Sequence, residues 1–128
     1  MGSDGRIGCS DDAVALFAPR LHGAPFEQFC VAHLGSDRHL LRVDQVTEDH
    51  RARVEVPLRD LFRRALGAGA EALILAHNHP SGDPGPSRAD LLVTRRLVAI
   101  ARPLGLTVLD HLIFAGTAVT SFRALGLL

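Results

Sequence analysis

The chain has 128 residues, the length of one domain, and 47% of them are hydrophobic, which is enough to form a core and too many for a wholly disordered chain. Fourteen basic residues balance fourteen acidic ones, so the chain lacks the overall positive charge that is typical of nucleic-acid-binding domains. All the basic residues are arginines, which excludes a catalytic lysine. Two cysteines, Cys9 and Cys30, are too few for a disulfide framework or a four-cysteine zinc site.

The N-terminal sequence predicts a short flexible tail over residues 1–10. It contains no apolar core of the kind found in signal peptides, and no stretch of the chain approaches the roughly 20 apolar residues that span a membrane. We therefore expect a cytoplasmic protein without a membrane segment. In that reducing setting Cys30, which lies in an apolar run, is expected to be a buried free thiol.

Hydrophobic periodicity and turn residues predict three helices and a larger number of strands. The helices are expected at residues 11–20, 57–66 and 87–104, and the strands at residues 27–34, 39–46, 54–56, 71–76, 106–109, 112–115 and 118–119. Asp11 or Asp12 is the candidate N-cap of the first helix, and Pro57 is expected at the start of the second. Residues 35–38 are typical of a hairpin turn. The sequence thus indicates a single mixed α/β domain without internal repeats.

The stretch HNHPSGDPGPSRAD, residues 77–90, follows an apolar strand and carries the candidate chemistry. At a strand end His77 and His79 point to the same side, because side chains alternate with a period of two. Ser87 and Asp90 are three residues apart at the start of a predicted helix, hence on one face. The loop between the two pairs is rich in proline and glycine, so it has little freedom to lose on binding. Two imidazoles and one carboxylate form the three-ligand set of a catalytic zinc site.

Simpler interpretations of the same residues remain open. A Ser-x-x-acid pattern before an apolar run is a helix-capping signature, in which Ser87 caps the helix and Asp90 reaches back to a backbone donor. The two histidines could instead hydrogen-bond to carbonyl groups of the loop. Capping and metal binding are compatible, and the combination of His-x-His, a proline-rich loop and Ser-x-x-Asp favours a metal site.

His77-x-His79-Pro80 followed by Ser87-x-x-Asp90 resembles the JAMM (JAB1/MPN/Mov34-type) metalloprotease motif. The same stretch and several later residues are similar to the bacterial RadC subfamily; these later residues are Thr94, Leu97 and Leu104-Gly105-Leu106-x-x-x-Asp110-His111-Leu112-Ile113. The resemblance covers roughly residues 27–128. It implies that residues 11–128 form one JAMM/MPN domain, a mixed sheet flanked by helices that resembles the cytidine-deaminase fold.

The resemblance implies a zinc-dependent hydrolase of peptide or isopeptide bonds, with a peptide or protein as its substrate. His77, His79 and Asp90 match the three zinc ligands, and Ser87 matches the serine that hydrogen-bonds the developing oxyanion. Glu27 matches the family's glutamate on an early strand, the general base that acts on the metal-activated water; taken alone, a glutamate there indicates a solvated strand end. Zinc lowers the pKa of its bound water from about 15.7 to about 7, which supplies hydroxide at neutral pH.

Asp110 and His111 allow two interpretations. They could lie beside the metal site, where the carboxylate would orient a ligand histidine, or they could satisfy backbone groups between two closing strands. The remaining histidines, at positions 22, 33, 39 and 50, are interpreted as ordinary. One family feature is missing, because RadC-type sequences have a His-Pro pair before an Arg-acidic pair, whereas this chain reads Val56-Pro57-Leu58-Arg59-Asp60.

Rival functions are compatible with the same sequence. A catalytically idle JAMM-like interaction domain would keep the fold without the chemistry. A DNA-associated protein would use a basic patch of Arg59, Arg63 and Arg64, although these residues equally suit a solvated helix face, and the zero net charge disfavours nucleic acid as a partner. A zinc deaminase is disfavoured because the Pro-Cys-x-x-Cys signature is missing.

Overall fold

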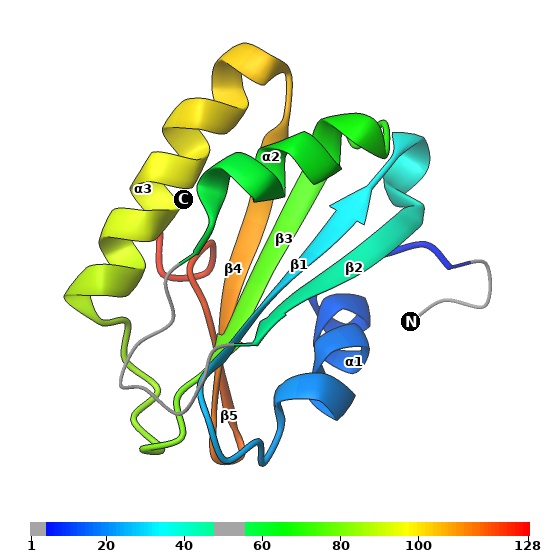
Figure 1. Ribbon diagram of the computed structural model, residues 1–128. Coiled ribbons are helices and arrows are strands. Elements are labelled where there is room, and N and C mark those ends of the chain that lie inside the picture. Colours follow the sequence, from blue (N-terminus) through cyan, green and yellow to red (C-terminus); the bar gives the residue numbers. More distant parts are fainter. Residues whose placement is uncertain (1–4, 48–55) are drawn as a thin grey trace.

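The computed structural model describes residues 5–47 and 56–128, and it shows a five-stranded mixed sheet with helices packed on both faces (Figure 1). The elements in chain order are α1 (Ser10–Leu21), β1 (Gln28–Leu34), the 3-10 turn η1 (Ser36–Arg38), β2 (Leu40–Thr47), α2 (Leu58–Gly67), β3 (Ala72–Asn78), α3 (Arg88–Ala101), the 3-10 turn η2 (Arg102–Leu104), β4 (Thr107–Ala115) and β5 (Ala118–Ser121). The predicted mixed α/β fold is confirmed. Residues 54 and 55 of the strand predicted at 54–56 lie outside the described part of the chain.

The strands are ordered β2-β1-β3-β4-β5 across the sheet. β1 is antiparallel to both β2 and β3, β3 and β4 are parallel and joined through α3, and β4 and β5 form an antiparallel hairpin. Every residue of β3 is buried, because it is a central strand and helices cover both faces of the sheet. Since α3 leads from β3 to a parallel strand, the helix begins at the end of the sheet where β3 stops (Figure 1).

Alternation along the strands divides the core into two parts. On one face α1 packs against Cys30 and Ala32 of β1, and on the other face α2 and α3 pack against Phe29 and Val31. This division follows from the side-chain period of two in a strand. Cys30 has no exposed surface, and burial raises the pKa of its thiol to about 11, so the buried free thiol predicted from the sequence is confirmed.

Several residues of the segment predicted to be a tail take part in the fold. Ile7 is buried in the core on the α1 side, with 2% of its surface exposed. Arg6 forms an isolated β-bridge with His39, at the end of the turn that leads into β2. In the part of the chain that the structure describes, no helix is long and apolar enough to cross a membrane.

The N-cap predicted for the first helix is wrong. The helix begins at Ser10 with Cys9 as its N-cap, and both aspartates lie inside the first turn, where the positive end of the helix dipole favours acidic side chains. Asp12 accepts a hydrogen bond from the Gly8 backbone N–H at 2.9 Å, and this bond lowers the pKa of the carboxyl group. Asp12 therefore links the first turn of α1 to the preceding chain.

The strand predictions in the second half of the chain are corrected at two places. The sequence predicts separate strands at residues 106–109 and 112–115, on either side of Asp110 and His111, whereas the structure has the single strand β4. Both polar residues are buried and hydrogen-bonded, so the strand continues through them. For the same reason β3 extends to Asn78, two residues beyond its predicted end.

Candidate metal centre

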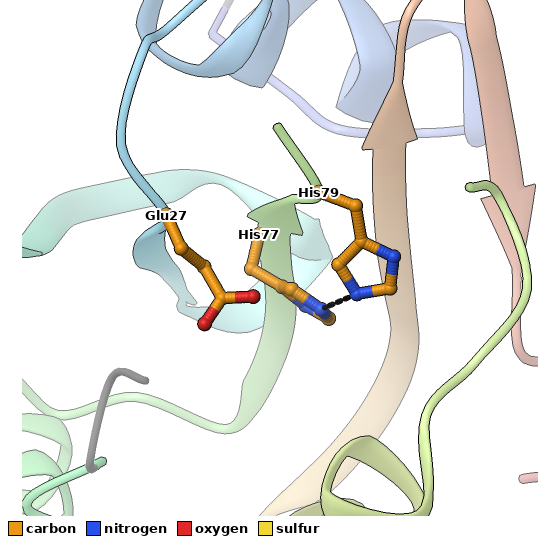
Figure 2. A group of neighbouring side chains, drawn as sticks. All are labelled: Glu27, His77 and His79. Carbon is orange, nitrogen blue, oxygen red and sulfur yellow. Dashed lines mark hydrogen bonds between the residues drawn. The ribbon is translucent and has the colours of Figure 1, made fainter. Parts of the chain in front are cut away.

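The residues of the His-x-His and Ser-x-x-Asp patterns meet at the end of the sheet where β3 stops and α3 begins. His77 is the last residue but one of β3, His79 follows the strand, and Asp90 is in the first turn of α3. Glu27 comes from the segment immediately before β1, and its carboxylate lies beside His77 (Figure 2). These side chains and Ser87 line an open cleft of about 850 Å³. The fold thus brings together residues that are far apart in the sequence.

Three donor groups converge in this cleft. Nε2 of His77 lies 2.9 Å from Nε2 of His79, a contact drawn in Figure 2. The Asp90 carboxylate places Oδ1 3.1 Å from His77 Nε2 and Oδ2 3.1 Å from His79 Nε2. Glu27 offers a second carboxylate, whose oxygen lies within 4.8 Å of the histidine nitrogens. The two histidines are therefore flanked by two carboxylates, one from α3 and one from the segment before β1.

The chemistry and spacing of these donors fit a divalent ion of the zinc type. His79 Nδ1 lies 2.8 Å from the Asp83 carbonyl oxygen, which can only accept, so Nδ1 carries a hydrogen and the neutral ring presents a lone pair at Nε2. Two ligands that bind a tetrahedral ion at about 2.0–2.1 Å are about 3.3 Å apart. The observed separations of 2.9 and 3.1 Å are close to this value. Imidazole nitrogen and carboxylate oxygen are both ligands that zinc takes in proteins.

Asp90 and Ser87 form a capping box at the start of α3. The Asp90 N–H donates to Ser87 Oγ at 3.0 Å, and the Ser87 N–H donates to Asp90 Oδ2 at 2.8 Å. Burial raises the pKa of Asp90, but the neighbouring His77 and the hydrogen bonds from Ser87 outweigh burial and hold the pKa well below its usual value. The capping interpretation is confirmed, and the same carboxylate contacts both histidines.

Two hydrogen bonds fix the loop over residues 80–86, one to His79 and one to β5. The Gly82 N–H donates to the His79 carbonyl at 3.0 Å, and the Thr120 hydroxyl on β5 donates to the Pro84 carbonyl at 2.8 Å. Gly82 has a φ of +86°, a conformation that residues with a side chain rarely adopt. This fixed loop supplies the carbonyl that orients the His79 ring.

Asn78, between the two histidines, has no role in the sequence-based interpretation. Its Oδ1 accepts a hydrogen bond from the Gln28 N–H at 2.7 Å, and its Nδ2 donates to the carbonyls of Phe26 at 3.0 Å and Ala24 at 3.3 Å. These bonds fix the backbone on both sides of Glu27 against the end of β3. The available signal was its place directly after an apolar strand, because a buried amide needs hydrogen-bond partners.

Asp110 and His111 lie in different surroundings. The Asp110 carboxylate accepts hydrogen bonds from the backbone N–H of His111 at 2.7 Å and of Arg123 at 3.1 Å, and from the Ser121 hydroxyl at 2.6 Å. It therefore satisfies groups around the β4–β5 hairpin. The His111 side chain points to the opposite face of the sheet from that of Asp110, and its Nε2 lies 2.7 Å from Nδ1 of His77. Burial lowers the pKa of His111 well below its usual value.

Thr94 on α3 also joins this group, although its sequence position gave it no role. Its hydroxyl donates to the Asp90 carbonyl at 2.8 Å, and its Oγ1 lies 2.6 Å from Nδ1 of His111. The spacing of four from Asp90 places the two residues on one helix face. The contact with His111 depends on the β3–β4 register, in which His111 pairs with Leu75, and local sequence does not specify that register.

One of the other histidines is buried and has a side-chain partner. His33, interpreted as ordinary, has no exposed surface, and its Nε2 lies 2.8 Å from the Asp44 carboxylate on β2. Its place two residues after Val31, on the inward face of the strand, was the available signal. His22 and His39 are exposed, and position 50 lies outside the described residues.

Two of the three arginines of α2, Arg63 and Arg64, form ion pairs with nearby acids. Asp60 forms ion pairs with Arg63 and with Arg64, the latter at 2.8 Å, and Arg64 also lies 3.3 Å from Asp44. The arginine side chains of these pairs are 79% and 46% exposed, as expected for a solvated helix face. Two members of the basic patch considered from the sequence are therefore paired with acidic side chains, which lowers the net positive charge on this helix face.

Comparisons with known proteins agree with this architecture. A profile of the RadC-like JAB domain matches residues 7–127. The chain is 46% identical over 121 residues to UPF0758 protein STH371 of Symbiobacterium thermophilum, which covers 94% of this chain and 52% of that protein. It is 46% identical over 108 residues to a UPF0758 protein of Rhodobacter capsulatus, with coverages of 81% and 49%. It is 41% identical over 111 residues to UPF0758 protein YkfG of Escherichia coli (strain K12), with coverages of 85% and 70%.

The chain spans about half the length of the first of these relatives, at 52% coverage. The profile match, in contrast, includes the segment before β1, strand β3 and the start of α3, which carry the candidate metal centre. The resemblance inferred from the His-x-His and Ser-x-x-Asp patterns is confirmed. The chain belongs to the RadC-like JAB domain family.

Proposed function

We propose that this domain is a zinc-dependent hydrolase of peptide or isopeptide bonds. The observation that carries the proposal is the convergence of His77 Nε2, His79 Nε2 and the Asp90 carboxylate within 3.1 Å of one another, in an open cleft beside Glu27. Three such ligands leave a fourth position for water or substrate, which is the arrangement of catalytic rather than structural zinc sites. When bound, the ion would activate water at neutral pH and polarise the scissile carbonyl group.

Glu27 is the residue that would move protons. Its carboxylate lies within 4.8 Å of the histidine nitrogens and is not among the three converging donors. A carboxylate beside the attacking water can accept its proton and pass that proton to the leaving amine. The Asn78 bonds to the flanking backbone hold this glutamate in place before a substrate arrives.

Ser87 would stabilise the negative charge that develops on the carbonyl oxygen. Its Oγ accepts a hydrogen bond from the Asp90 N–H, which uses a lone pair, so the hydroxyl hydrogen can be donated to another atom. Ser87 lines the same cleft as Glu27 and the two histidines. One donor aimed at an oxyanion contributes about 10²–10³ in rate.

The cleft has a mixed lining that supports a polypeptide substrate. Phe29, Leu58 and Val93 supply apolar surface, and Arg96 supplies a positive charge. Apolar walls with a few polar groups are the usual features of sites that bind organic ligands. In the described part of the chain, two of the three arginines considered for a DNA-binding patch, Arg63 and Arg64, are paired with acids, which disfavours the DNA-associated alternative. The converging donor groups favour a metal site over an idle interaction domain.

The metal is tested first, by inductively coupled plasma mass spectrometry on protein purified without a chelating column. We expect about one zinc ion per chain, as a single three-ligand site requires, and loss of the ion in His79→Ala. His22→Ala removes an exposed histidine outside the cleft and serves as the matched control. Absence of metal in the wild type, even after zinc is added, would contradict the proposal and favour the hypothesis of a catalytically idle interaction domain.

Hydrolysis is tested next, with peptide and isopeptide substrate libraries. Glu27→Gln keeps the shape of the side chain and removes its ability to accept a proton, so we expect normal zinc content and a rate about 10²–10⁴ lower. Hydrolysis at the wild-type rate would exclude Glu27 as the base. Ser87→Gly costs a helix cap only a few tenths of a kcal/mol, so a lower rate in this variant reports the loss of the hydroxyl rather than unfolding.

A further inference from the structure

We infer that Thr94 and His111 are positioning residues, which form a hydrogen-bond relay that fixes His77 with its Nε2 lone pair directed at the metal position. The relay runs from the Asp90 carbonyl through the Thr94 hydroxyl to His111, and from His111 to His77. The inference rests on the proposed metal site, but its geometric part concerns the protein alone. It assigns a function to two residues that do not touch the metal position.

The direction of the relay is set at the Asp90 end. The Asp90 carbonyl oxygen can only accept, and it lies 2.8 Å from Thr94 Oγ1, so the single hydroxyl hydrogen of Thr94 points toward it. Thr94 Oγ1 therefore faces Nδ1 of His111 with a lone pair, across 2.6 Å. The hydrogen between these two atoms must then belong to Nδ1 of His111.

The surroundings of His111 keep the ring neutral. The residue has no exposed surface, its ring stacks on Phe122 with 4.5 Å between ring centroids, and the edge of Phe29 lies against it at 5.8 Å. Charging an imidazole in such apolar surroundings is costly. With its hydrogen on Nδ1, the neutral ring presents a lone pair at Nε2.

The contact between His111 and His77 then determines which ring nitrogen of His77 carries the hydrogen. His111 Nε2 lies 2.7 Å from His77 Nδ1, so the hydrogen between them belongs to His77. The Nε2 atom of His77 is then left with its lone pair, directed at His79 and Asp90. The opposite direction would put a hydrogen on His77 Nε2 and prevent that atom from binding a metal ion.

One residue begins and ends the relay. The carbonyl of Asp90 orders the Thr94 hydroxyl, and the carboxylate of Asp90 meets His77 Nε2 at the other end. The single helical turn from Asp90 to Thr94 therefore positions the Asp90 carboxylate and, through His111, determines which ring nitrogen of His77 carries the hydrogen. Ligand histidines in metal sites usually donate their second nitrogen to a fixed acceptor, and loss of that acceptor typically costs about 10–100-fold in metal affinity.

The test uses Thr94→Val, which keeps the shape of the side chain without its hydroxyl, and Thr94→Ser, which restores the hydroxyl. The first readout is the ring form of each histidine in the metal-free protein, from long-range proton–nitrogen correlation spectra at mildly alkaline pH. We expect hydrogen on Nδ1 of both His77 and His111 in the wild type and in Thr94→Ser. In Thr94→Val we expect a mixture of ring forms.

The second readout is zinc affinity, measured by competition with a chromophoric chelator. We expect Thr94→Val to weaken binding about 10–100-fold, with Thr94→Ser close to wild type. Thr107→Val, at an exposed position of β4, is the matched control and should not change affinity. Thermal unfolding of each variant shows whether the fold is retained.

The two readouts separate the relay from the proposed function. A wild-type spectrum with hydrogen on Nε2 of His111 would overturn the relay without any variant, even if Thr94→Val failed to fold. Zinc binding by the wild type together with unchanged ring forms and affinity in a folded Thr94→Val protein would also overturn it, and would leave the proposed function intact. Failure of the wild type to bind zinc would contradict the proposed function, while the spectra would still decide the ring forms.

Discussion

Asp90 joins helix stability to the candidate chemistry in a single side chain. Its Oδ2 accepts the Ser87 N–H and also lies 3.1 Å from His79 Nε2, while Oδ1 contacts His77. The pKa of this carboxyl group lies well below its usual value, so the group is anionic at neutral pH. A capping box is therefore not an alternative to a metal ligand here, because the helix start holds the ligand in position.

Asn78 offers a test of how Glu27 is positioned. Asn78→Asp keeps the size of the side chain but places a carboxylate oxygen against the carbonyls of Phe26 and Ala24, to which the amide now donates. A buried group that loses its donor costs about 1–3 kcal/mol. We expect a lower melting temperature, normal zinc content, since both histidines remain, and reduced hydrolysis, because the backbone around Glu27 is displaced.

The control for Asn78→Asp is Gln45→Glu, the same chemical change at an exposed position of β2, where the amide donates to the side chain of Gln28 in an exposed hydrogen bond. It should leave melting temperature, zinc content and hydrolysis close to wild type. The account of Asn78 would be contradicted if Asn78→Asp hydrolysed substrate at the wild-type rate while the protein remained folded. Loss of zinc would contradict the same role, because the Asn78 amide contacts the backbone around Glu27 and not the proposed metal ligands.

Strand β3 and helix α3 form the rigid frame of the site. β3 is buried along its whole length and pairs with β1 so that Phe29 is opposite His77, and the two rings stack with centroids 6.1 Å apart. α3 begins at the same end of the sheet and presents Asp90 and Thr94 on one face. Sites on regular elements keep their geometry better than sites on loops, which favours metal binding without rearrangement.

The pairing of β1 with β2 predicts a pH dependence of stability. His33 is buried between these strands and α2, and burial lowers its pKa, against the smaller opposing effect of Asp44. Between its two pKa values, a group whose pKa is lower in the folded state binds more protons in the unfolded chain. The free energy of unfolding therefore rises with pH in this range. The contribution of His33 is present above its ordinary pKa of 6.5 and is lost as pH falls toward the folded value.

We therefore expect the free energy of unfolding, measured by urea denaturation, to decrease as the pH falls below about 6.5. His33→Gln can still donate to Asp44 but does not titrate, so the decrease should be smaller in this variant. It should not vanish, because burial also lowers the pKa of His111. His22→Gln, at an exposed position, is the control. The same pH dependence in wild type and His33→Gln would show that His33 does not contribute.

Across the whole molecule, the sequence correctly predicted those elements and residue groups whose geometry is set by neighbours in the sequence. Helical spacing located α2 and α3, and strand-type residues located β1 and β2. His77, His79 and Asp90 could be grouped because one short loop joins their elements, which makes their spacing informative. Glu27 is fifty residues away from His77, and only its resemblance to a family residue linked the two.

What the sequence did not predict depends on long-range pairing. Thr94 and His111 meet because β3 and β4 are parallel in a register that no local pattern specifies. Asn78 reaches the segment before β1 only because β1 and β3 are neighbours in the sheet. The break predicted inside β4 has the same origin, because its polar pair finds buried partners that are distant in sequence.

The central claim is that two imidazole nitrogens and one carboxylate form a metal site, and crystals soaked in zinc test it most directly. Diffraction data recorded on both sides of the zinc absorption edge locate the ion without any assumption about activity. We predict one anomalous peak about 2.0–2.2 Å from His77 Nε2, His79 Nε2 and an Asp90 carboxylate oxygen. A cleft without such a peak, or a zinc ion bound only by other residues, would contradict the account.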